Sequence, residues 1–292
     1  MTPVVSVVVP AYQSAAHIGK TLSSVLAQTF EDLELVVVDD ASTDGTVEVA
    51  RSFPDDRLRV LANQTNVGPV ENWNRAVAEA RGRFVKLLCG DDVLYPTCID
   101  RQVRALGAPD AAGAVMTACR RDILDEAGDV LIAGRGLDGL TGLVPAAVAL
   151  RAAVRAGTNV FGEPAAVMVR AEALALCGPF SSRLPYTVDL DMWCRVLEHG
   201  DLVAVPEALC GFRVVATSWS VSLGRQQAAQ ARRLLADVRR RHPDEITRVD
   251  ETLGRVRATT LAAGRRLLYR RLARRAGARA DSGSRSAAPA GP

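Results

Sequence analysis

Acidic and tight-turn residues follow three of the four strands predicted near the start of the chain. The first strand ends in Pro10-Ala11-Tyr12, the second in Asp39-Asp40 and the fourth in Asp91-Asp92. Parallel strands present their carboxyl ends along one edge of a sheet, so we expect these residues to share that edge. Carboxylates gathered there repel each other unless a cation lies among them. A hard cation such as Mg²⁺ takes carboxylate oxygens together with substrate phosphates. The pattern therefore indicates a metal–diphosphate site.

The hydrophobic pattern that must position these residues alternates between strand and helix. An apolar, β-branched run at 4–9 is typical of a buried strand, and Ile18, Leu22, Val25 and Leu26 then recur at helical spacing. Repeated units of this kind with short connections predict an α/β fold, a mostly parallel sheet with helices on both faces. The further strands expected are 33–38, 58–62, 84–88, 165–169, 202–205 and 209–214, and the further helices are 44–51, 70–77, 189–199 and 225–276.

Composition and cysteine use exclude several classes of protein. Hydrophobic residues make up 48% of the 292, which is enough for a core and argues against a disordered chain. No apolar run approaches the roughly 18–20 residues of a membrane helix, and the N-terminus lacks an export signal, so we expect a cytoplasmic protein. The six cysteines are scattered and only three histidines accompany them, so no zinc cluster is predicted and the thiols are expected to be reduced.

The charge is divided unevenly along the chain. Residues 1–220 sum to −8 and residues 221–292 to +11, so no uniform nucleic-acid-binding surface is indicated. The Arg-rich segment 221–279 predicts amphipathic helices, broken near Pro243, that either lie on an anionic membrane or cover the acidic body. The Ser/Ala/Gly/Pro-rich end, 280–292, is predicted to be disordered.

An ordered set of motifs over residues 1–215 closely resembles inverting glycosyltransferase family 2, whose members have the GT-A fold. The set comprises Val4–Tyr12, Gln28-Thr29, Val37–Thr46 with its Asp-Asp and Ser-Thr-Asp-Gly-Thr, Asn66-x-Gly68, Asn72-Trp73-Asn74, Gly90–Pro96 and Asp189-x-Asp191-x-Trp193-x-Arg195. The resemblance implies a GT-A domain at 1–220, with a nucleotide-sugar half at 1–106 and an acceptor half at 107–220.

The resemblance assigns residues to the nucleotide. Tyr12 would pack near the base, and Asp40 would accept a hydrogen bond from the base or the ribose. The alternatives are a half-buried aromatic at the end of a strand for Tyr12, and a turn or helix cap for Asp39 and Asp40. Loop capping explains Asn66 and Asn72 almost as well as binding does. The other residues assigned to the nucleotide side are Pro10, Ala11, Asn66, Gly68 and Asn72.

Asp91 and Asp92 match the family's metal motif. Asp92 would be the ligand of a diphosphate-bound Mn²⁺ or Mg²⁺, and Asp91 would reach the ribose or share the metal. Two departures from the family stand out. Cys89 replaces an acid, and a thiol is a poor ligand for a hard cation. Val215 occupies a position where relatives often carry His. The alternative is an acidic turn with no metal.

Asp189 matches the family's general base, which takes the proton of the acceptor hydroxyl on the face of the sugar opposite the leaving group. A helix N-cap is the alternative for Asp189, and Asp191 is the second choice of base. Arg195 would pair with a carboxylate or with a phosphate of the substrate, whereas Trp193 is expected in the core. A weaker resemblance places Asn159 and Glu163 in a loop on the acceptor side.

The function implied is a metal-dependent, inverting transfer of a sugar from a nucleotide diphosphate-sugar, UDP before dTDP or GDP. The acceptor would be a hydroxyl of a glycan, a lipid-linked saccharide or a natural product. The rivals are a sugar-1-phosphate nucleotidyltransferase, which needs a Gly-rich basic loop after the first strand, and a non-catalytic nucleotide-sugar-binding protein. A dinucleotide fingerprint at Gly134-x-Gly136-x-x-Gly139 is set aside, because no acid follows it by about 20 residues.

Overall fold

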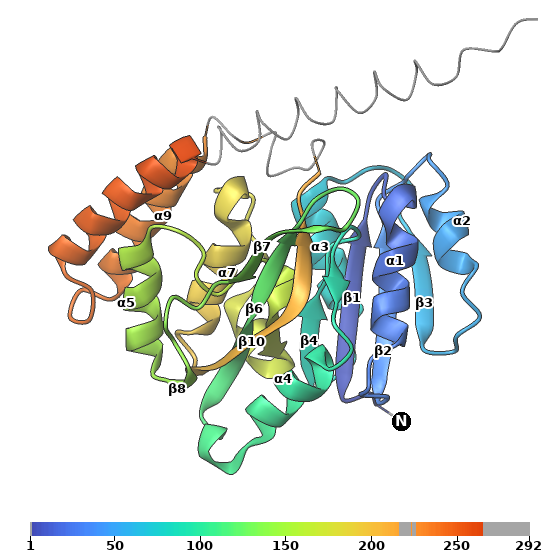
Figure 1. Ribbon diagram of the computed structural model, residues 1–292, viewed down its shortest axis with the longest axis horizontal. Coiled ribbons are helices and arrows are strands. Elements are labelled where there is room, and N and C mark those ends of the chain that lie inside the picture. Colours follow the sequence, from blue (N-terminus) through green and yellow to red (C-terminus); the bar gives the residue numbers. More distant parts are fainter. Residues whose placement is uncertain (1, 216–222, 224–225, 265–292) are drawn as a thin grey trace, which may run out of the picture.

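The computed structural model describes residues 2–215, 223 and 226–264, which form a ten-stranded sheet covered by helices (Figure 1). The strand order is β3-β2-β1-β4-β9-β6-β10-β5, with β7 paired to β6 and β8 paired to β10. Six strands share one direction: β1, β2, β3, β4, β6 and β10. The predicted α/β class with a mostly parallel sheet is confirmed.

The strands are β1 (Val5–Ala11), β2 (Leu33–Asp39), β3 (Leu58–Ala62), β4 (Phe84–Leu87), β5 (Val93–Leu94), β6 (Ala114–Leu124), β7 (Val130–Arg135), β8 (Gly142–Val144), β9 (Val167–Arg170) and β10 (Asp201–Arg213). The helices are α1 (Ala15–Leu26), α2 (Thr46–Arg51), α3 (Pro69–Ala78), α4 (Cys98–Gly107), α5 (Ala146–Ala156), α6 (Ala171–Cys177), α7 (Val188–Val196), α9 (Gln227–Arg241) and a last helix at 248–264. Short 3₁₀ turns occupy Pro109–Ala111, Pro164–Ala166 and Pro185–Thr187.

The sheet core follows from the valine-rich strands. Every residue of β1 and β2 is buried, because helices cover both faces of these strands. Val5, Val7 and Val9 belong to the apolar cluster that includes α1 and α4, whereas Val8 belongs to the cluster on the other face, where α3 contacts β1. This alternation fixes which strand ends lie side by side. Ala11 is paired with Asp39, so the polar ends of β1 and β2 are adjacent.

Two sequence predictions about strands change in the second half of the fold. The strands expected at 202–205 and 209–214 are one strand, β10, with register shifts on either side of Ala208. Pro206 has no N–H to donate to a neighbouring strand, so the chain bulges there and continues. Residues 107–165, where periodicity was weak, contain the β6–β7 hairpin and α5.

The C-terminal helices pack on the body of the protein. Leu234, Leu235 and Val238 of α9 belong to the same apolar cluster as α5 and α7. The last helix approaches α5 closely: a Cβ on Gly254 would lie 1.9 Å from the carbonyl oxygen of Val154. The buried Asp250 carboxylate joins the two helices, accepting hydrogen bonds from Arg151 Nε (3.0 Å) and Arg155 Nη1 (2.6 Å).

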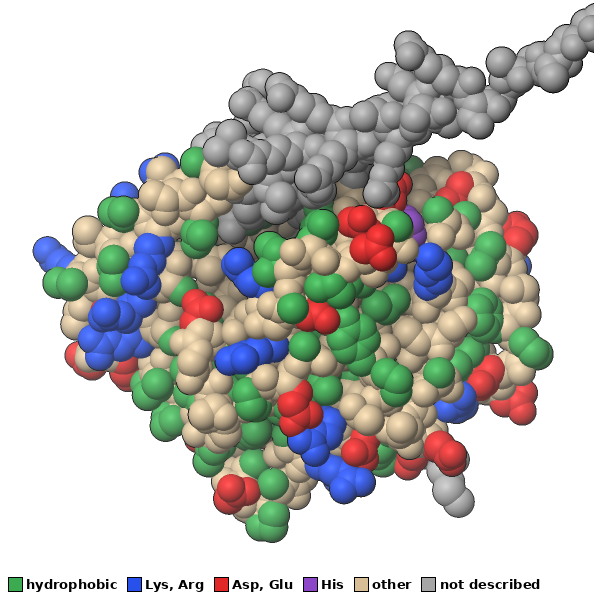
Figure 2. Space-filling view, viewed as in Figure 1, with side chains coloured by type: hydrophobic (Ala, Val, Ile, Leu, Met, Phe, Trp, Pro, Cys, Tyr) green, Lys and Arg blue, Asp and Glu red, His purple; other side chains and the backbone are tan. Residues whose placement is uncertain are grey.

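The first arginine run of this segment lies against acidic residues. Arg239 pairs with Glu251, and Arg241 pairs with Glu198. Figure 2 shows basic side chains on the part of the surface formed by α5 and the C-terminal helices. Over residues 226–264 the helices therefore cover the body, one of the two arrangements expected. The later arginine pairs at 265–266, 270–271 and 274–275 and the end at 280–292 lie outside the described residues. Among the helices of the described residues, none has the length and apolarity that crossing a membrane requires.

Candidate functional site

A cavity of about 1390 Å³ lies at the carboxyl ends of the parallel strands. Its wall includes the ends of β1 and β4, residues of the loop at 157–164 and the first turn of α7. The C-terminal helices complete it, with Leu235 from α9 and Leu261 from the last helix. The edge of the sheet where polar residues were predicted to lie together thus lines this cavity, which we call the chamber.

On the nucleotide side, the structure brings most of the predicted residues into this wall. Pro10, Ala11, Tyr12, Asp40, Asn66 and Asn72 line the cavity. Tyr12 is 52% exposed, so its ring is free to cover a flat ligand. Gly68 is absent from the lining, and its positive φ of 89° starts α3 instead. Its N–H donates to Asp40 Oδ2 (2.9 Å) and to Asn66 Oδ1 (3.1 Å).

Asp40 holds this side together. Its Oδ1 accepts hydrogen bonds from Asn63 Nδ2 (2.7 Å) and the N–H of Val67 (2.8 Å). The Asn63 amide also donates to Asn72 Oδ1 (3.1 Å), and Asn72 Nδ2 donates to the carbonyl of Val38 (2.9 Å). The loop after β3 is therefore shaped by these amides and one carboxylate, and Asn72 has both of its polar groups occupied. Sequence reasoning did not single out Asn63.

The acidic loop after β4 contains a cluster of possible metal ligands. One ligand atom each of Cys89, Asp91 and Asp92 lies within 4.8 Å of the others. Cys89 and Asp91 line the cavity, whereas Asp92 is fully buried behind them. Burial raises the pKa of Asp91, and burial together with the Asp91 charge raises the pKa of Asp92.

The donor set of this loop fits a divalent cation. Asp92 Oδ2 is buried without a hydrogen-bond partner among the described residues, and two carboxyl groups with raised pKa values lie together. The charge of Arg213 offsets burial and repulsion only in part, and a bound cation would add positive charge that stabilises both carboxylates. The expected ligand, Asp92, is set deeper than the prediction implied, and Asp91 is the acid that faces the chamber.

Arg213 fixes the position of the acidic loop. Its backbone N–H donates to Asp92 Oδ1 (2.9 Å), its Nε to the carbonyl of Asp91 (2.9 Å), and its Nη1 to the carbonyls of Asp125 and Glu126 (3.1 Å each). The pairing of Gly211 in β10 with Val93 in β5 brings the two segments together. Sequence reasoning noted this segment only for Val215, which also lines the cavity. A lone arginine at the end of a strand carries no signal that would have identified it.

Asp189 lies in the first turn of α7 and lines the same cavity. Its Oδ2 accepts a hydrogen bond from Asn159 Nδ2 (2.9 Å) and its Oδ1 one from the N–H of Leu190 (2.7 Å). Burial and then the charge of Glu163 raise the pKa of Asp189 to about 7, although these two hydrogen bonds and Arg121 favour the ionised form. A carboxylate with this pKa, facing a cavity, is suited to take a proton near neutral pH.

The loop bearing Asn159 and Glu163 lies beside Asp189. Glu163 forms an ion pair with Arg121, and Arg121 Nη2 donates to Glu163 Oε1 (3.1 Å). Arg121 comes from β6 and was not singled out from the sequence. Trp193 is buried as expected, and its Nε1 donates to the carbonyl of Gly162 (3.2 Å).

Asp191 and Arg195, which the sequence assigned to the site, do not line the cavity. Arg195 Nε donates to Asp191 Oδ2 (3.1 Å), which is the pairing with a carboxylate that was one of the two expectations for Arg195. The reason is helical geometry: residues two apart on a helix point about 200° apart, whereas residues four apart share a face. When Asp189 faces the chamber, Asp191 and Arg195 face away from it together. Arg195 also donates to the carbonyls of Cys177 and Pro179, so it anchors α7.

The glycine motif at 134–139 does not open a helix, as a dinucleotide site requires. The next element is the strand β8. Gly136 has φ of 109°, and a Cβ there would lie 2.5 Å from Arg121 Nη1. The absence of a side chain thus makes room for the arginine.

Comparison with known proteins adds to this geometry. Residues 6–126 match the family model described as Glycosyl transferase family 2. The chain is 33% identical over 216 residues to the Mycobacterium tuberculosis protein MT1568, covering 71% of this chain and 66% of that protein. It is 39% identical over 122 residues to the succinoglycan biosynthesis protein ExoO of Rhizobium meliloti, covering 42% of this chain and 34% of that protein. The chain thus spans about two thirds of one relative and one third of the other.

Solved structures share the fold. S. aureus TarS 1–349 in complex with UDP has a TM-score of 0.59 and 21% identity, covering 82% of this chain and 71% of that chain. The mannosyltransferase PcManGT from Pyrobaculum calidifontis, in complex with GDP-Man and Mn²⁺, has a TM-score of 0.60 and 20% identity, covering 90% and 76%. The predicted GT-A fold is confirmed.

Proposed function

This chain belongs to glycosyltransferase family 2, and we propose that it transfers a sugar from a nucleotide diphosphate-sugar to an acceptor hydroxyl with inversion at the anomeric carbon. The observation that carries the proposal is the position of two acids on one cavity. Asp91, with its buried neighbour Asp92, lines this cavity, and so does Asp189, whose pKa is raised to about 7.

Inversion of the anomeric carbon requires two separate groups, a base for the acceptor hydroxyl and a group that stabilises the leaving diphosphate. The acceptor oxygen must attack from the face of the sugar opposite the departing diphosphate, and a base must remove its proton as it attacks. In the proposal Asp189 is that base. The Asn159 amide and the N–H of Leu190 hold its carboxylate in place. Asp191 cannot replace it, because its side chain is paired with Arg195 outside the cavity.

The donor is proposed to lie along the ends of β1, β2 and β4. Tyr12 would cover the base, and Asp40 would shape the loop against which the nucleoside rests. Asp91 and Asp92 would hold Mn²⁺ or Mg²⁺, which when bound neutralises charge on the leaving diphosphate. Arg213 keeps the two aspartates in position through the contacts described above.

We favour a UDP-sugar as donor and a glycan or lipid-linked saccharide as acceptor. Fold neighbours have been solved with UDP and with GDP-Man, and one relative is a succinoglycan biosynthesis protein. Cys89 in place of an acid leaves the cation with ligands from Asp91, Asp92, the diphosphate and solvent. Contact with an anionic membrane through the arginine-rich C-terminus stays a prediction.

The test is a donor screen on the full chain. UDP-, dTDP- and GDP-sugars are added with and without Mn²⁺, and thermal stabilisation and release of the free nucleotide are recorded. The proposal predicts stabilisation that depends on both the nucleotide and Mn²⁺, with release slowed strongly by Asp189→Asn. A protein that binds nucleotide-sugar but never releases the nucleotide, with or without added acceptors, is a binding protein, and the proposal is then wrong.

A further inference from the structure

A second cavity of about 320 Å³ adjoins the main chamber on the acceptor side. Six described residues line both spaces: Arg121, Arg135, Thr158, Asn159, Thr260 and Leu261. None of Tyr12, Asp40, Asp91 or Arg213 lines the second cavity. It is therefore separate from the region proposed for the nucleotide and its phosphates, and it is next to the amide that holds Asp189.

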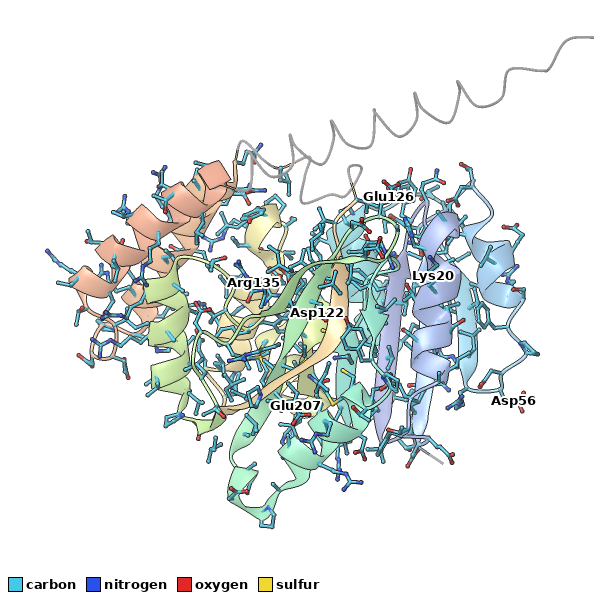
Figure 3. The ribbon with its side chains drawn as sticks, viewed as in Figure 1. Lys20, Asp56, Asp122, Glu126, Arg135 and Glu207 are labelled. Carbon is cyan, nitrogen blue, oxygen red and sulfur yellow. The ribbon has the colours of Figure 1, made fainter. Side chains whose placement is uncertain are left out.

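The described lining of this cavity is positively charged. It includes three arginines, Arg121, Arg135 and Arg257, and one acid, Asp138. Arg121 is balanced by Glu163. Arg257 Nη1 donates to the backbone carbonyl of Arg155 (3.1 Å). A carbonyl has no net charge, so this hydrogen bond leaves the positive charge of Arg257 unneutralised. The side chain of Arg135 has no hydrogen bond or ion pair with another described residue, and Figure 3 shows it projecting from β7 in the region between α5 and β6.

One donor in this cavity is buried and unused. Arg121 is 6% exposed, and its Nη1 has no hydrogen-bond partner among the described residues. Gly136, which also lines the cavity, leaves the space that this nitrogen occupies. A buried guanidinium N–H without an acceptor costs free energy unless a ligand supplies one, and a phosphate or carboxylate oxygen forms the strongest bond to it.

We propose that this cavity binds an anionic group, a phosphate or a carboxylate, that the acceptor carries near its attacking hydroxyl. The inference rests on the proposed transferase function. Asn159 links the two sites, because it lines both cavities and donates to the carboxylate of Asp189. An acceptor whose hydroxyl lies at Asp189 would place its anionic group against Arg121 and Arg135, with Arg257 and the Thr158 and Thr260 side chains around it.

The experiment measures binding of charged and uncharged probes to the full chain already saturated with UDP and Mn²⁺, so that phosphate cannot occupy the diphosphate region. Calorimetric titrations use glucose, glucose 1-phosphate, glucuronic acid and farnesyl diphosphate. The last two separate a carboxylate and a lipid-borne diphosphate from a phosphate carried on a sugar. Saturation by UDP is recorded first. Failure at that step counts against the proposed function, whereas failure only at the second step counts against this inference.

We expect at least one charged probe to bind about tenfold more tightly than glucose, and Arg135→Gln to weaken that probe by about five- to tenfold without affecting glucose. Arg51→Gln is the matched control. Arg51 is an exposed arginine at the end of α2, and Figure 1 places α2 at the opposite end of the molecule from α5. Thermal unfolding verifies that each variant is folded. Equal binding of all four probes, or a charged probe whose affinity is the same in Arg135→Gln and Arg51→Gln, would overturn the proposal.

Discussion

The two sides of the cavity are built differently. On the side proposed for the nucleotide, the residues lie at or after the ends of strands within the first hundred positions, and Asn63 donates hydrogen bonds to both Asp40 and Asn72. On the acceptor side, Arg121, Asn159 and Asp189 come from β6, a loop and α7, and the C-terminal helices close the wall. The side proposed for the nucleotide is formed by the ends of strands that are close in the sequence. The side proposed for the acceptor is formed by segments far apart in the sequence that pack together.

The largest expected effect tests the acceptor side. Asp189→Asn should reduce sugar transfer by about 10²–10⁴-fold, because the base is lost while the hydrogen bond from Asn159 can be kept. UDP binding, measured by calorimetry with Mn²⁺, should change little. A variant that transfers sugar at the parent rate would show that the base lies elsewhere.

The second largest effect is expected on metal-dependent UDP binding, when the aspartates of the acidic loop are replaced. Asp92→Asn keeps an oxygen for the N–H of Arg213 but removes the buried charge, and should weaken Mn²⁺-dependent UDP binding by about 10–100-fold. Asp91→Asn should act in the same direction. Titration of UDP with and without Mn²⁺ provides the measurement. Metal-dependent binding unchanged in both variants would place the cation outside this loop.

The contact between the C-terminal helix and α5 should matter for stability. Burial alone would raise the pKa of Asp250, but hydrogen bonds from Thr247, Arg155 and Arg151 outweigh burial and hold the pKa well below its usual range. This carboxylate therefore stabilises the fold above pH ~4, and the contribution is lost as the pH falls further. Asp250→Asn should cost about 2 kcal/mol at pH 7 and less at pH 3, as measured by urea unfolding. An equal cost at both pH values would contradict this account.

Asp189 should have the opposite effect on stability. Its pKa is raised to about 7, so the folded protein holds this proton more tightly than the unfolded chain does. The free energy of unfolding therefore falls as the pH rises from about 4 to about 7. Asp189→Asn should therefore raise Tm by about 2–4 °C at pH 8 and leave it unchanged near pH 4. Transfer by the parent enzyme should increase with pH through about 7. A Tm difference that does not depend on pH would be inconsistent with a buried, ionising carboxyl.

The smallest expected effect distinguishes the two acids of α7. Asp191→Asn removes only the pairing with Arg195 and should change stability by about 0.5 kcal/mol and transfer by less than about twofold. It is the control for Asp189→Asn, since it makes the same change on the same helix. If Asp191→Asn slowed transfer as much as Asp189→Asn, the two faces of α7 would not differ in function.

The sequence predicted that most of the residues proposed to bind the nucleotide would lie together at one edge of the sheet. Pro10–Tyr12, Asp40 and Asp91 lie at or just after the ends of buried strands, and parallel strands must bring such ends together. Helical geometry would also have separated Asp189 from Asp191 once α7 was assigned. Periodicity was too weak to reveal the β6–β7 hairpin, because β7 is largely exposed and has no apolar alternation to read.

Sequence alone determined the α/β class, the positions of the first four strands along the chain and the edge of the sheet where the acids lie, because these follow from short-range patterns. Only the tertiary structure decided that Asp92 is buried next to Asp91, that Arg213 contacts them from 121 and 122 residues away, and that the C-terminal helices form part of the cavity wall. The physical reason is that burial and the partners of a charged group depend on segments far apart in the chain, and no local pattern records which of them will meet.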